Sequence, residues 1–427
     1  MCEKGPLKTG AFLFSGKLVS VLLQRFGAAV ITLGLLSVSC GSDQSPAVNS
    51  APLLISPGSA RLRSGDSLQF DANASPVSWS SSNPVVSVSS TGLASAATLS
   101  IVVPPSSSLI TASLGGATSN TAMVTVVPPL GTMQKLNSGL TPASRPQLPV
   151  SGPDGNIWFT QFASNQIGRL TPSTGAVREF PIPGSNPLGI CAGPDGNLWF
   201  TEDFGNRIGS ITPAGVVREF TAGISADAGP EYICAGPDGN LWFTEGDGDR
   251  VGKITPGGVV TEFSAGITAG SNPNGICAGP DGNLWFTELL GSRIGRITPD
   301  GQVSEFSSGI APGSELQQIC LGPDGALWFT ERSAGKVGRI TVTGAVTEFS
   351  AGITPGSLPA GICLGPDGNL WFVEQAGRIA RITPAGVVTE FTGSLSSTAG
   401  AFGINPGPDG NLWFALIEEN ALGVLVP

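Results

Sequence analysis

Short runs of alternating apolar and polar residues, separated by turns rich in Pro, Asp and Gly, recur from about residue 131 to the C-terminus. In the copy over residues 275–306 the runs are GICA, LWFTE, RIGRIT and QVSEF. The turns GPDG and TPDG join the first run to the second and the third run to the fourth. Pro presets φ at the first corner of such a turn, and Gly supplies the positive φ that closes a hairpin. The pattern therefore predicts four short antiparallel strands per copy, here termed strands A to D in chain order.

This unit is repeated with nearly constant spacing. Successive GPDG turns begin 41 to 43 residues apart, and a Trp-Phe pair follows each of them. A period in the low forties with four short strands per unit is typical of a β-propeller. We therefore predict an all-β fold with a seven-bladed β-propeller over residues 128–427. The turns begin at Gly152, Gly193, Gly236, Gly279, Gly322, Gly365 and Gly407.

The two ends of the repeat array predict how the ring closes. The final unit stops after its strand C, so it lacks a strand D. Upstream of the first unit, GTMQKL (131–136) matches the strand D pattern GVVTEF, and Leu136 precedes Gly152 by the same distance as Phe263 precedes Gly279. The N-terminal segment should therefore supply the outer strand of the last blade, a 1+3 closure that removes a free sheet edge.

Residues 51–127 have a different composition, which is rich in Ser, Ala and Val. Alternating stretches such as SLQFDA and AMVTVV predict short strands in an N-terminal β-sandwich. The run VSWSSSNPVVSVSSTGLASA (77–96) resembles bacterial immunoglobulin-like (Ig-like) domains. The resemblance implies that Trp79 is a core anchor and that the domain acts as a spacer or adhesion module.

The N-terminus has the pattern of an export signal. Basic residues precede a 14-residue apolar run (26–39), which is short for a transmembrane helix and typical of a signal peptide over residues 1–39. Cys40 follows at once, and residues 40–50 form a polar tether. The segment resembles a bacterial lipoprotein signal, which implies a lipidated Cys40 and a lipid-anchored protein of the cell envelope. A cleaved secretory signal and an uncleaved anchor are the alternatives.

The amino-acid composition indicates which classes of binding partner are unfavourable. Charged residues make up only 12% of the chain, its formal net charge is −10, and its hydrophobic content of 40% is too high for a disordered chain. Removal of the basic leader would make the chain more acidic still, which disfavours nucleic acid as a partner. We expect a monomer that contacts the membrane through its lipid.

The repeated residues fit structural roles. We predict that the Trp-Phe pairs are core, and that Asp and Asn of GPDGN bond their own turn, with a calcium site at each turn as the alternative. Five cysteines occupy one strand A position, and we interpret them as small buried thiols rather than as metal ligands or disulfides. They are Cys191, Cys234, Cys277, Cys320 and Cys363.

A glutamate ends strand B in five of the units. A ring of carboxylates could bind a cation or a basic ligand, whereas a base at the start of strand C could instead pair with each glutamate across the turn. The loop EGDGDR adds Asp247 and Asp249 to Glu245, which makes these three a candidate calcium site. The glutamates and their facing bases are Glu202–Arg207, Glu245–Arg250, Glu288–Arg293, Glu331–Lys336 and Glu374–Arg378.

The positions that differ between units are candidates for ligand binding. A–B and C–D turns lie on one face, the turn face, while the dissimilar B–C and D–A loops lie on the other, the variable face. The residue two places before the strand A Ile also differs in each unit, and these residues should surround the channel mouth on the variable face. They are Gln147, Leu188, Glu231, Asn274, Gln317, Ala360 and Phe402.

The unit GICAGPDGNLWFTE…RIGRITP.G.VTEF resembles the repeat of streptogramin B lyases (virginiamycin B lyases). The resemblance implies a propeller and an activity that opens a cyclic depsipeptide by elimination, with Mg²⁺ and a histidine base. The family's histidines fall on Ala360 and Phe402, and a family tyrosine falls on Gln147. The chain contains no His at all, so the usual base near neutral pH is absent.

The metal-binding glutamates of the family are also replaced. One falls on Gly400 and the other on Ile417, with Glu418 one place beyond. Two hypotheses follow, each without an assured cofactor and with Mg²⁺ or Ca²⁺ as the candidate ions. The first is a non-catalytic envelope lipoprotein that binds a small molecule, glycan or protein. The second is a divergent carbon–oxygen lyase, or a hydrolase, that uses Glu231, Glu245, Asp247 and Asp249.

Overall fold

The computed structural model describes residues 52–97 and 106–427. The predicted signal segment and Cys40 lie outside these residues. All elements of the described part are β-strands, and none of its residues belongs to a helix long and apolar enough to span a membrane. The prediction of an all-β chain is confirmed.

The N-terminal strands form small sheets around their own core. One sheet has the order β2-β10-β8-β5 with β9 beside β8, a second has the order β3-β7-β6, and β1 pairs with β4. Trp79 packs against this core, its ring 6.4 Å from that of Phe70. The strands are β1 (Ile55–Ser56), β2 (Ser59–Arg63), β3 (Ser67–Gln69), β4 (Asp71–Ala72), β5 (Ser78–Ser81), β6 (Val86–Val88), β7 (Leu93–Ala96), β8 (Ser106–Leu114), β9 (Ala117–Thr118) and β10 (Ala122–Val127).

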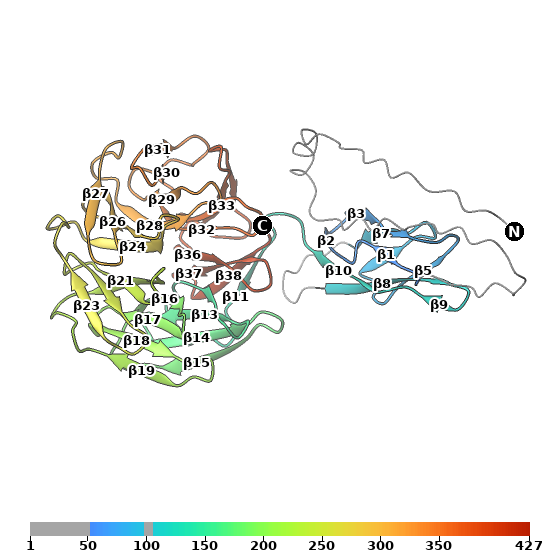
Figure 1. The fold of residues 1–427 in the computed structure, drawn as a ribbon, viewed down its shortest axis with the longest axis horizontal. Helices are drawn as coiled ribbons and strands as arrows, with labels where there is room; N and C mark the ends of the chain where they lie inside the picture. Colours follow the sequence, from blue (N-terminus) through green and yellow to red (C-terminus); the bar gives the residue numbers. More distant parts are fainter. Residues whose placement is uncertain (1–51, 98–105) are drawn as a thin grey trace, which may run out of the picture. The chain divides into compact units, whose positions relative to one another are not determined.

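Seven four-stranded antiparallel sheets follow, and Figure 1 shows them arranged as blades around a common centre. Blades one to three contain β12 (Val150–Ser151), β13 (Ile157–Gln161), β14 (Gln166–Thr171) and β15 (Ala176–Pro181); β16 (Pro187–Ala192), β17 (Leu198–Glu202), β18 (Arg207–Ile211) and β19 (Val217–Phe220); and β20 (Pro230–Ala235), β21 (Leu241–Glu245), β22 (Arg250–Ile254) and β23 (Val260–Phe263).

Blades four to six repeat the same arrangement. They contain β24 (Pro273–Ala278), β25 (Leu284–Glu288), β26 (Arg293–Ile297) and β27 (Val303–Phe306); β28 (Leu316–Leu321), β29 (Leu327–Glu331), β30 (Lys336–Ile340) and β31 (Val346–Phe349); and β32 (Pro359–Leu364), β33 (Leu370–Glu374), β34 (Arg378–Ile382) and β35 (Val388–Phe391).

The seventh blade joins the two ends of the array. It contains β36 (Ala401–Pro406), β37 (Leu412–Leu416), β38 (Ala421–Leu425) and, from upstream, β11 (Met133–Leu136). β11 lies antiparallel to β38, with Met133 opposite Leu425 and Leu136 opposite Leu422. The predicted 1+3 closure is confirmed at the predicted strand. The first strand of each blade contacts the first strands of both neighbours, including β12 with β36, so these inner strands surround the axis.

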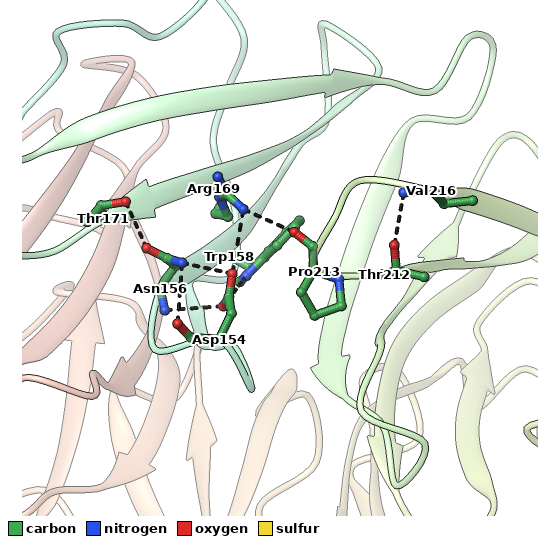
Figure 2. A network of polar contacts seen from close by, with 8 residues as sticks. All are labelled: Asp154, Asn156, Trp158, Arg169, Thr171, Thr212, Pro213 and Val216. Carbon is green, nitrogen blue, oxygen red and sulfur yellow. Dashed lines mark hydrogen bonds and ion pairs between the residues drawn. The ribbon is translucent and has the colours of Figure 1, made fainter.

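Each GPDG turn is a hydrogen-bonded corner that also holds the following tryptophan. In the first blade Gly155 has φ +73° and its N–H donates to the Gly152 carbonyl at 3.1 Å. The indole Nε1 of Trp158 donates to Asp154 Oδ1 at 2.9 Å, and Asn156 Nδ2 donates to Asp154 Oδ2 at 2.8 Å (Figure 2). Burial alone would raise the pKa of Asp154, but the hydrogen bonds from Trp158 and Asn156 lower it below its usual value. The predicted turn role of Asp and Asn is confirmed.

The same network ties neighbouring blades together. Arg169 on β14 donates to the carbonyl of Pro213, in the turn between β18 and β19, at 3.0 Å, while it lies 3.7 Å from Asp154 (Figure 2). Lys253 repeats this contact two blades further on by donating to the Pro299 carbonyl at 3.0 Å. The charged residue on strand C thus links its own A–B turn to the C–D turn of the next blade.

The Trp-Phe pairs are core, as predicted. All seven pairs are at most 1% exposed. In six blades the tryptophan stacks on the strand D phenylalanine, as Trp285 does on Phe306 with ring centroids 5.4 Å apart. The phenylalanine that follows covers a strand C glycine so closely that a Cβ on Gly295 would lie 2.0 Å from Phe286 Cζ. Glycine is therefore required there by the packing of the ring.

Candidate functional site

Five of the seven variable residues stand at an irregularity in strand A of their blade. In the second to sixth blades the pairing of strand A with strand B shifts register where the variable residue stands, as between Pro230 and Ile233 around Glu231. Such bulges re-aim side chains and are common next to binding sites. That these seven residues surround the channel mouth and bind a ligand stays a prediction.

Neighbouring blades hold the backbone of these positions. A strand B threonine donates its hydroxyl to the carbonyl of the variable residue in the next blade, as Thr201 does to Glu231 at 2.6 Å. The side chain can therefore change without altering the anchor. The other pairs are Thr160–Leu188, Thr244–Asn274, Thr287–Gln317 and Thr330–Ala360. Val373 occupies the threonine position of the sixth blade, so Phe402 lacks this bond.

The side chains of the ring differ in accessibility. Leu188, Glu231, Gln317 and Phe402 are partly exposed, whereas Ala360 is buried. Gln147 and Asn274 are 7% and 5% exposed, and each has a buried carbonyl oxygen, Oε1 and Oδ1, without a hydrogen-bond partner. Two orphaned amide oxygens at the channel mouth are acceptors that a ligand could satisfy.

Acidic groups gather at the third-blade part of this ring. Glu231 accepts a hydrogen bond from Asn274 Nδ2. Burial first, and then the nearby Asp203 and Asp247 carboxylates, raises the pKa of Glu231 to about 8. Burial and Asp247 also raise the pKa of Asp203 to about 6. Three acidic side chains, Glu231, Asp203 and Asp247, thus lie close enough to affect one another, so this part of the mouth attracts positive charge.

An aromatic pair flanks the acidic group. Phe204, directly after Asp203, is 74% exposed, and its ring meets Phe162 edge-on with centroids 5.8 Å apart. Asp203 and Phe204 were not among the predicted site residues. Their signal was the unusual B–C loop DFGN, which carries an aromatic residue, as does the first-blade loop that contains Phe162.

The predicted calcium site at Glu245, Asp247 and Asp249 is not assembled. Glu245 is fully buried and faces Glu262 and Arg250. Asp249 accepts backbone hydrogen bonds from Gly270 and Asn272, at 2.6 and 2.9 Å. Asp247 lies instead with Glu231 and Asp203. Within residues 52–97 and 106–427, no three Cys, His, Asp or Glu side chains are arranged to hold one metal ion.

The strand B glutamates pair with the base across the turn in three blades only. Glu202–Arg207, Glu288–Arg293 and Glu245–Arg250 approach to 2.7, 3.4 and 3.9 Å. The predicted pairs of Glu331 and Glu374 are wrong, because Lys336 pairs with Glu348 and Arg378 with Glu390 on strand D instead. No carboxylate oxygen of Glu331 or Glu374 makes a hydrogen bond of good geometry, although Ser314 and Ser357 lie close enough to lower the pKa of these two groups.

A second glutamate, on strand D, explains this arrangement. In the first blade Glu179 accepts hydrogen bonds from the N–H and hydroxyl of Thr141, at 2.8 and 2.7 Å, and so fixes the loop that enters the blade. Gln161 ends strand B there and donates Nε2 to Glu179 Oε1 at 2.7 Å. In five other blades a glutamate replaces this glutamine, and burial raises the pKa of each to about 7 or 8. These glutamates serve the scaffold rather than a ligand.

A cavity of about 370 Å³ occupies the axis, away from the predicted ring. It is lined by inner-strand residues, including all five cysteines, and by none of the seven variable residues. Its lining includes Leu321 and Leu364, which are 37% and 36% exposed where strand A meets the turn face. The five thiols are free, as predicted, but only Cys363 is buried; the other four are partly exposed. The sequence analysis did not predict that the five cysteines line a cavity. Their shared position on the innermost strand of each blade was the signal that they lie near the axis.

The chain is similar to known proteins in sequence and in fold. The virginiamycin B lyase family model matches residues 117–309 and 222–427. The solved virginiamycin B lyase from Staphylococcus aureus is 37% identical, with a TM-score of 0.64, over 69% of this chain and 99% of its own. The chain belongs to the virginiamycin B lyase family.

Two further family structures match over the same share of this chain. A streptogramin B lyase is 36% identical over 96% of its length, with a TM-score of 0.64. A catalytically inactive histidine-to-alanine variant of the Staphylococcus aureus virginiamycin B lyase, solved with quinupristin, is 36% identical over 99% of its length, also with a TM-score of 0.64. A comparison with curated proteins gives no match.

The magnesium site expected of a virginiamycin B lyase does not fit the residues present here. A Cβ on Gly400 would lie 2.9 Å from Glu418 Cγ, so the first expected ligand position faces Glu418. Glu418 is itself an exposed side chain paired with Arg145 at 3.1 Å. Ala360 and Phe402, at the expected histidine positions, supply no ligand or base. One exposed, ion-paired carboxylate is too little to hold Mg²⁺.

Proposed function

We propose that this member of the virginiamycin B lyase family is an exported, lipid-anchored protein that binds a ligand on its variable face without opening it. The observation that carries the proposal is the absence of His from the whole chain. A family lyase that is inactive after a histidine-to-alanine change has been solved with quinupristin, which supports binding in the absence of catalysis.

The ligand class follows from the third-blade part of the mouth. Glu231, Asp203 and Asp247 attract positive charge, and the exposed Phe204 offers an apolar and cation-attracting surface beside them. We propose a ligand with a basic group seated at Glu231 and an apolar part against Phe204. The variable ring Gln147, Leu188, Glu231, Asn274, Gln317, Ala360 and Phe402 forms the rest of its surroundings.

Calorimetric titration with quinupristin tests this assignment. Glu231→Gln removes the carboxyl that would lose its proton to a bound basic group, and Asp300→Asn is the matched control because Asp300 is exposed in a C–D turn of the turn face. We expect binding by the wild type, about tenfold or greater weakening in Glu231→Gln, consistent with a lost charge-assisted contact, and no change in Asp300→Asn. Equal loss in both variants, or no binding by the wild type, would contradict the proposed site for this class of ligand.

The remaining parts of the chain fit a surface role. We propose that residues 51–127 form an Ig-like sandwich that spaces the propeller from the membrane, and that Cys40 carries the lipid. Cys40→Ser should move the full chain from the membrane fraction to the soluble envelope fraction. Unchanged membrane association would contradict the lipid anchor.

A divergent lyase or hydrolase is the second candidate, favoured by one observation. Burial and neighbouring carboxylates raise the pKa of Glu231 to about 8, within the range of a general base near neutral pH. Under this alternative, quinupristin would be converted and Glu231→Gln would abolish conversion while keeping the fold. Binding without any change in ligand mass supports the first candidate instead.

A further inference from the structure

The axial cavity on the turn-face side combines a defined volume with an unusual set of side chains. Five free cysteines, one on each inner strand of the second to sixth blades, line its volume of about 370 Å³. The remaining lining is almost entirely aliphatic or backbone, and it includes no Lys, Arg, Asp or Glu. Val150 and Asn405 fill the cysteine position in the first and seventh blades, so the thiols form one unbroken arc.

The cavity is separated from the variable face. Tyr232 on β20 and Gln318 on β28 both line it, and they lie close enough across the axis for Gln318 to affect the pKa of Tyr232, although the third and fifth blades are not neighbours. Gln318 Oε1 also accepts the N–H of Ile362 on β32 at 3.3 Å. Tyr232 and Gln318 stand between the variable residues and the cysteines on their strands, and none of the variable residues lines the cavity, so the thiols are distinct from the proposed ligand site.

Thiols on adjacent inner strands lie side by side. A Cβ on Gly189, two residues before Cys191, would lie 2.8 Å from the Cα of Tyr232, two residues before Cys234. The same closeness recurs between Gly275 and Gln318, where the distance is 2.7 Å. Backbones in contact at this level place cysteines of equal register next to each other on neighbouring strands.

Two of the thiols also pack against core clusters that span their own blade and the next. Cys191 packs against the cluster that contains Ile233, and Cys277 packs against the cluster that contains Ile319. Ile233 directly precedes Cys234, and Ile319 directly precedes Cys320, so each of these clusters reaches the strand that carries the next thiol. The structure thus presents neighbouring pairs of soft donors rather than groups of three.

We propose that neighbouring cysteine pairs in this cavity bind a soft divalent cation that takes two thiolates in a line, of which Hg²⁺ is the representative. Soft thiolate ligands select soft metals. Each site forms by Hg²⁺ + 2 Cys–SH → Cys–S–Hg–S–Cys + 2 H⁺, in which two S–H bonds break, two Hg–S bonds form and no oxidation state changes. The product is neutral, which suits a cavity without charged residues, whereas a monovalent ion would leave an uncompensated negative charge.

Because the thiols are protonated, a metal ion must displace their protons in order to bind. Burial raises the pKa of all five thiols, that of Cys234 to about 12, so free thiolate is scarce and the cavity is unreactive toward ordinary electrophiles. Metal binding releases these protons because the ligand must be deprotonated.

The test compares two double variants with equal numbers of cavity thiols, made in the full chain with Cys2→Ser and Cys40→Ser. Cys234→Ser with Cys320→Ser leaves Cys191, Cys277 and Cys363, none of which are neighbours. Cys191→Ser with Cys363→Ser leaves three consecutive thiols. Each protein is titrated with Hg²⁺ in the presence of 2-mercaptoethanol as a competing thiol, and the mass of the complex is measured by native mass spectrometry. The competition is informative because a preorganised second thiol acts at an effective concentration in the millimolar range.

We expect the parent to retain two Hg²⁺ ions, the variant with consecutive thiols one, and the variant with separated thiols none, which is a loss of affinity of about 100-fold or more. Each retained ion should replace two protons in the measured mass. Should a serine variant fail to fold, judged by its tryptophan spectrum, the alanine pairs replace it, and the parent's stoichiometry stands as a second measurement. Equal retention by the two double variants, or no retention by the parent, would overturn the proposal.

Discussion

The buried carboxyl pair of the sixth blade gives the sharpest stability prediction. Glu374 is fully buried, and burial first, then the Glu390 carboxylate, raises its pKa to about 8 although Arg378 and Ser357 act in the opposite direction. Glu390 in turn accepts hydrogen bonds from the N–H and the hydroxyl of Thr354. The pair therefore needs one proton on Glu374 near neutral pH.

In the first blade a glutamine amide takes the place of the protonated carboxyl, since Gln161 Nε2 donates to Glu179 Oε1 at 2.7 Å. Glu374→Gln should reproduce this bond to Glu390. An unperturbed glutamate titrates near 4.5, so the stability that the protonated Glu374 contributes is fully present below pH 4.5 and is lost as pH rises toward about 8. The loss is about 1.4 kcal/mol per pH unit, so Glu374→Gln should exceed the wild type by about 3 kcal/mol at about pH 7.

Urea unfolding followed by tryptophan fluorescence at a series of pH values from 4.5 to about 8 measures this difference. The two proteins should be nearly equal at the acid end and should diverge steadily as pH rises. Gln161→Glu is the reciprocal control: it creates a buried carboxyl pair in the first blade and should steepen the loss of stability with pH. Parallel pH profiles for the wild type and both variants would refute the shared-proton interpretation.

Two further predictions concern the repeated core. Asp281→Ala removes the acceptor of the buried Trp285 indole N–H, 3.1 Å away, and should cost about 1–3 kcal/mol in thermal or urea unfolding, with Asp281→Asn costing less because it keeps an acceptor oxygen. A destabilisation by Asn as large as that by Ala would contradict the turn network. Gly295→Ala places a methyl group against Phe286 and should cost about 1–3 kcal/mol, whereas Ala380→Gly in the sixth blade, where Phe372 already faces an alanine, should cost less than about 1 kcal/mol. Similar costs for the two changes would argue against steric closeness as the reason for the glycine.

The scaffold could be predicted from the sequence because its determinants are local and are repeated. GPDG carries its own hairpin chemistry, and the distance from Leu136 to Gly152 alone located the strand that closes the ring. Strand alternation likewise predicted the burial of Trp285 and Phe286. Each of these inferences needs only residues within one unit or the count between units.

The site could be predicted only in part, because its contacts join residues that are far apart in the chain. Glu331 and Glu374 were expected to pair with the nearest base, but strand D brings Glu348 and Glu390 to those bases instead. Asp247 was expected to join Glu245 in its own loop, yet it lies with Glu231 of the inner strand. Which of several carboxylates a base meets depends on the tertiary packing of strands and loops, and sequence spacing does not specify it.

Mass spectrometry of quinupristin after incubation with the full chain and Mg²⁺ tests the central claim most directly. The account predicts a quinupristin–protein complex in the native spectrum, and released quinupristin with unchanged mass and fragmentation, because no histidine base and no magnesium site are present in the variable face described above. A ring-opened product that accumulates with time, and that is lost in Glu231→Gln, would contradict the account and establish a lyase that works without histidine.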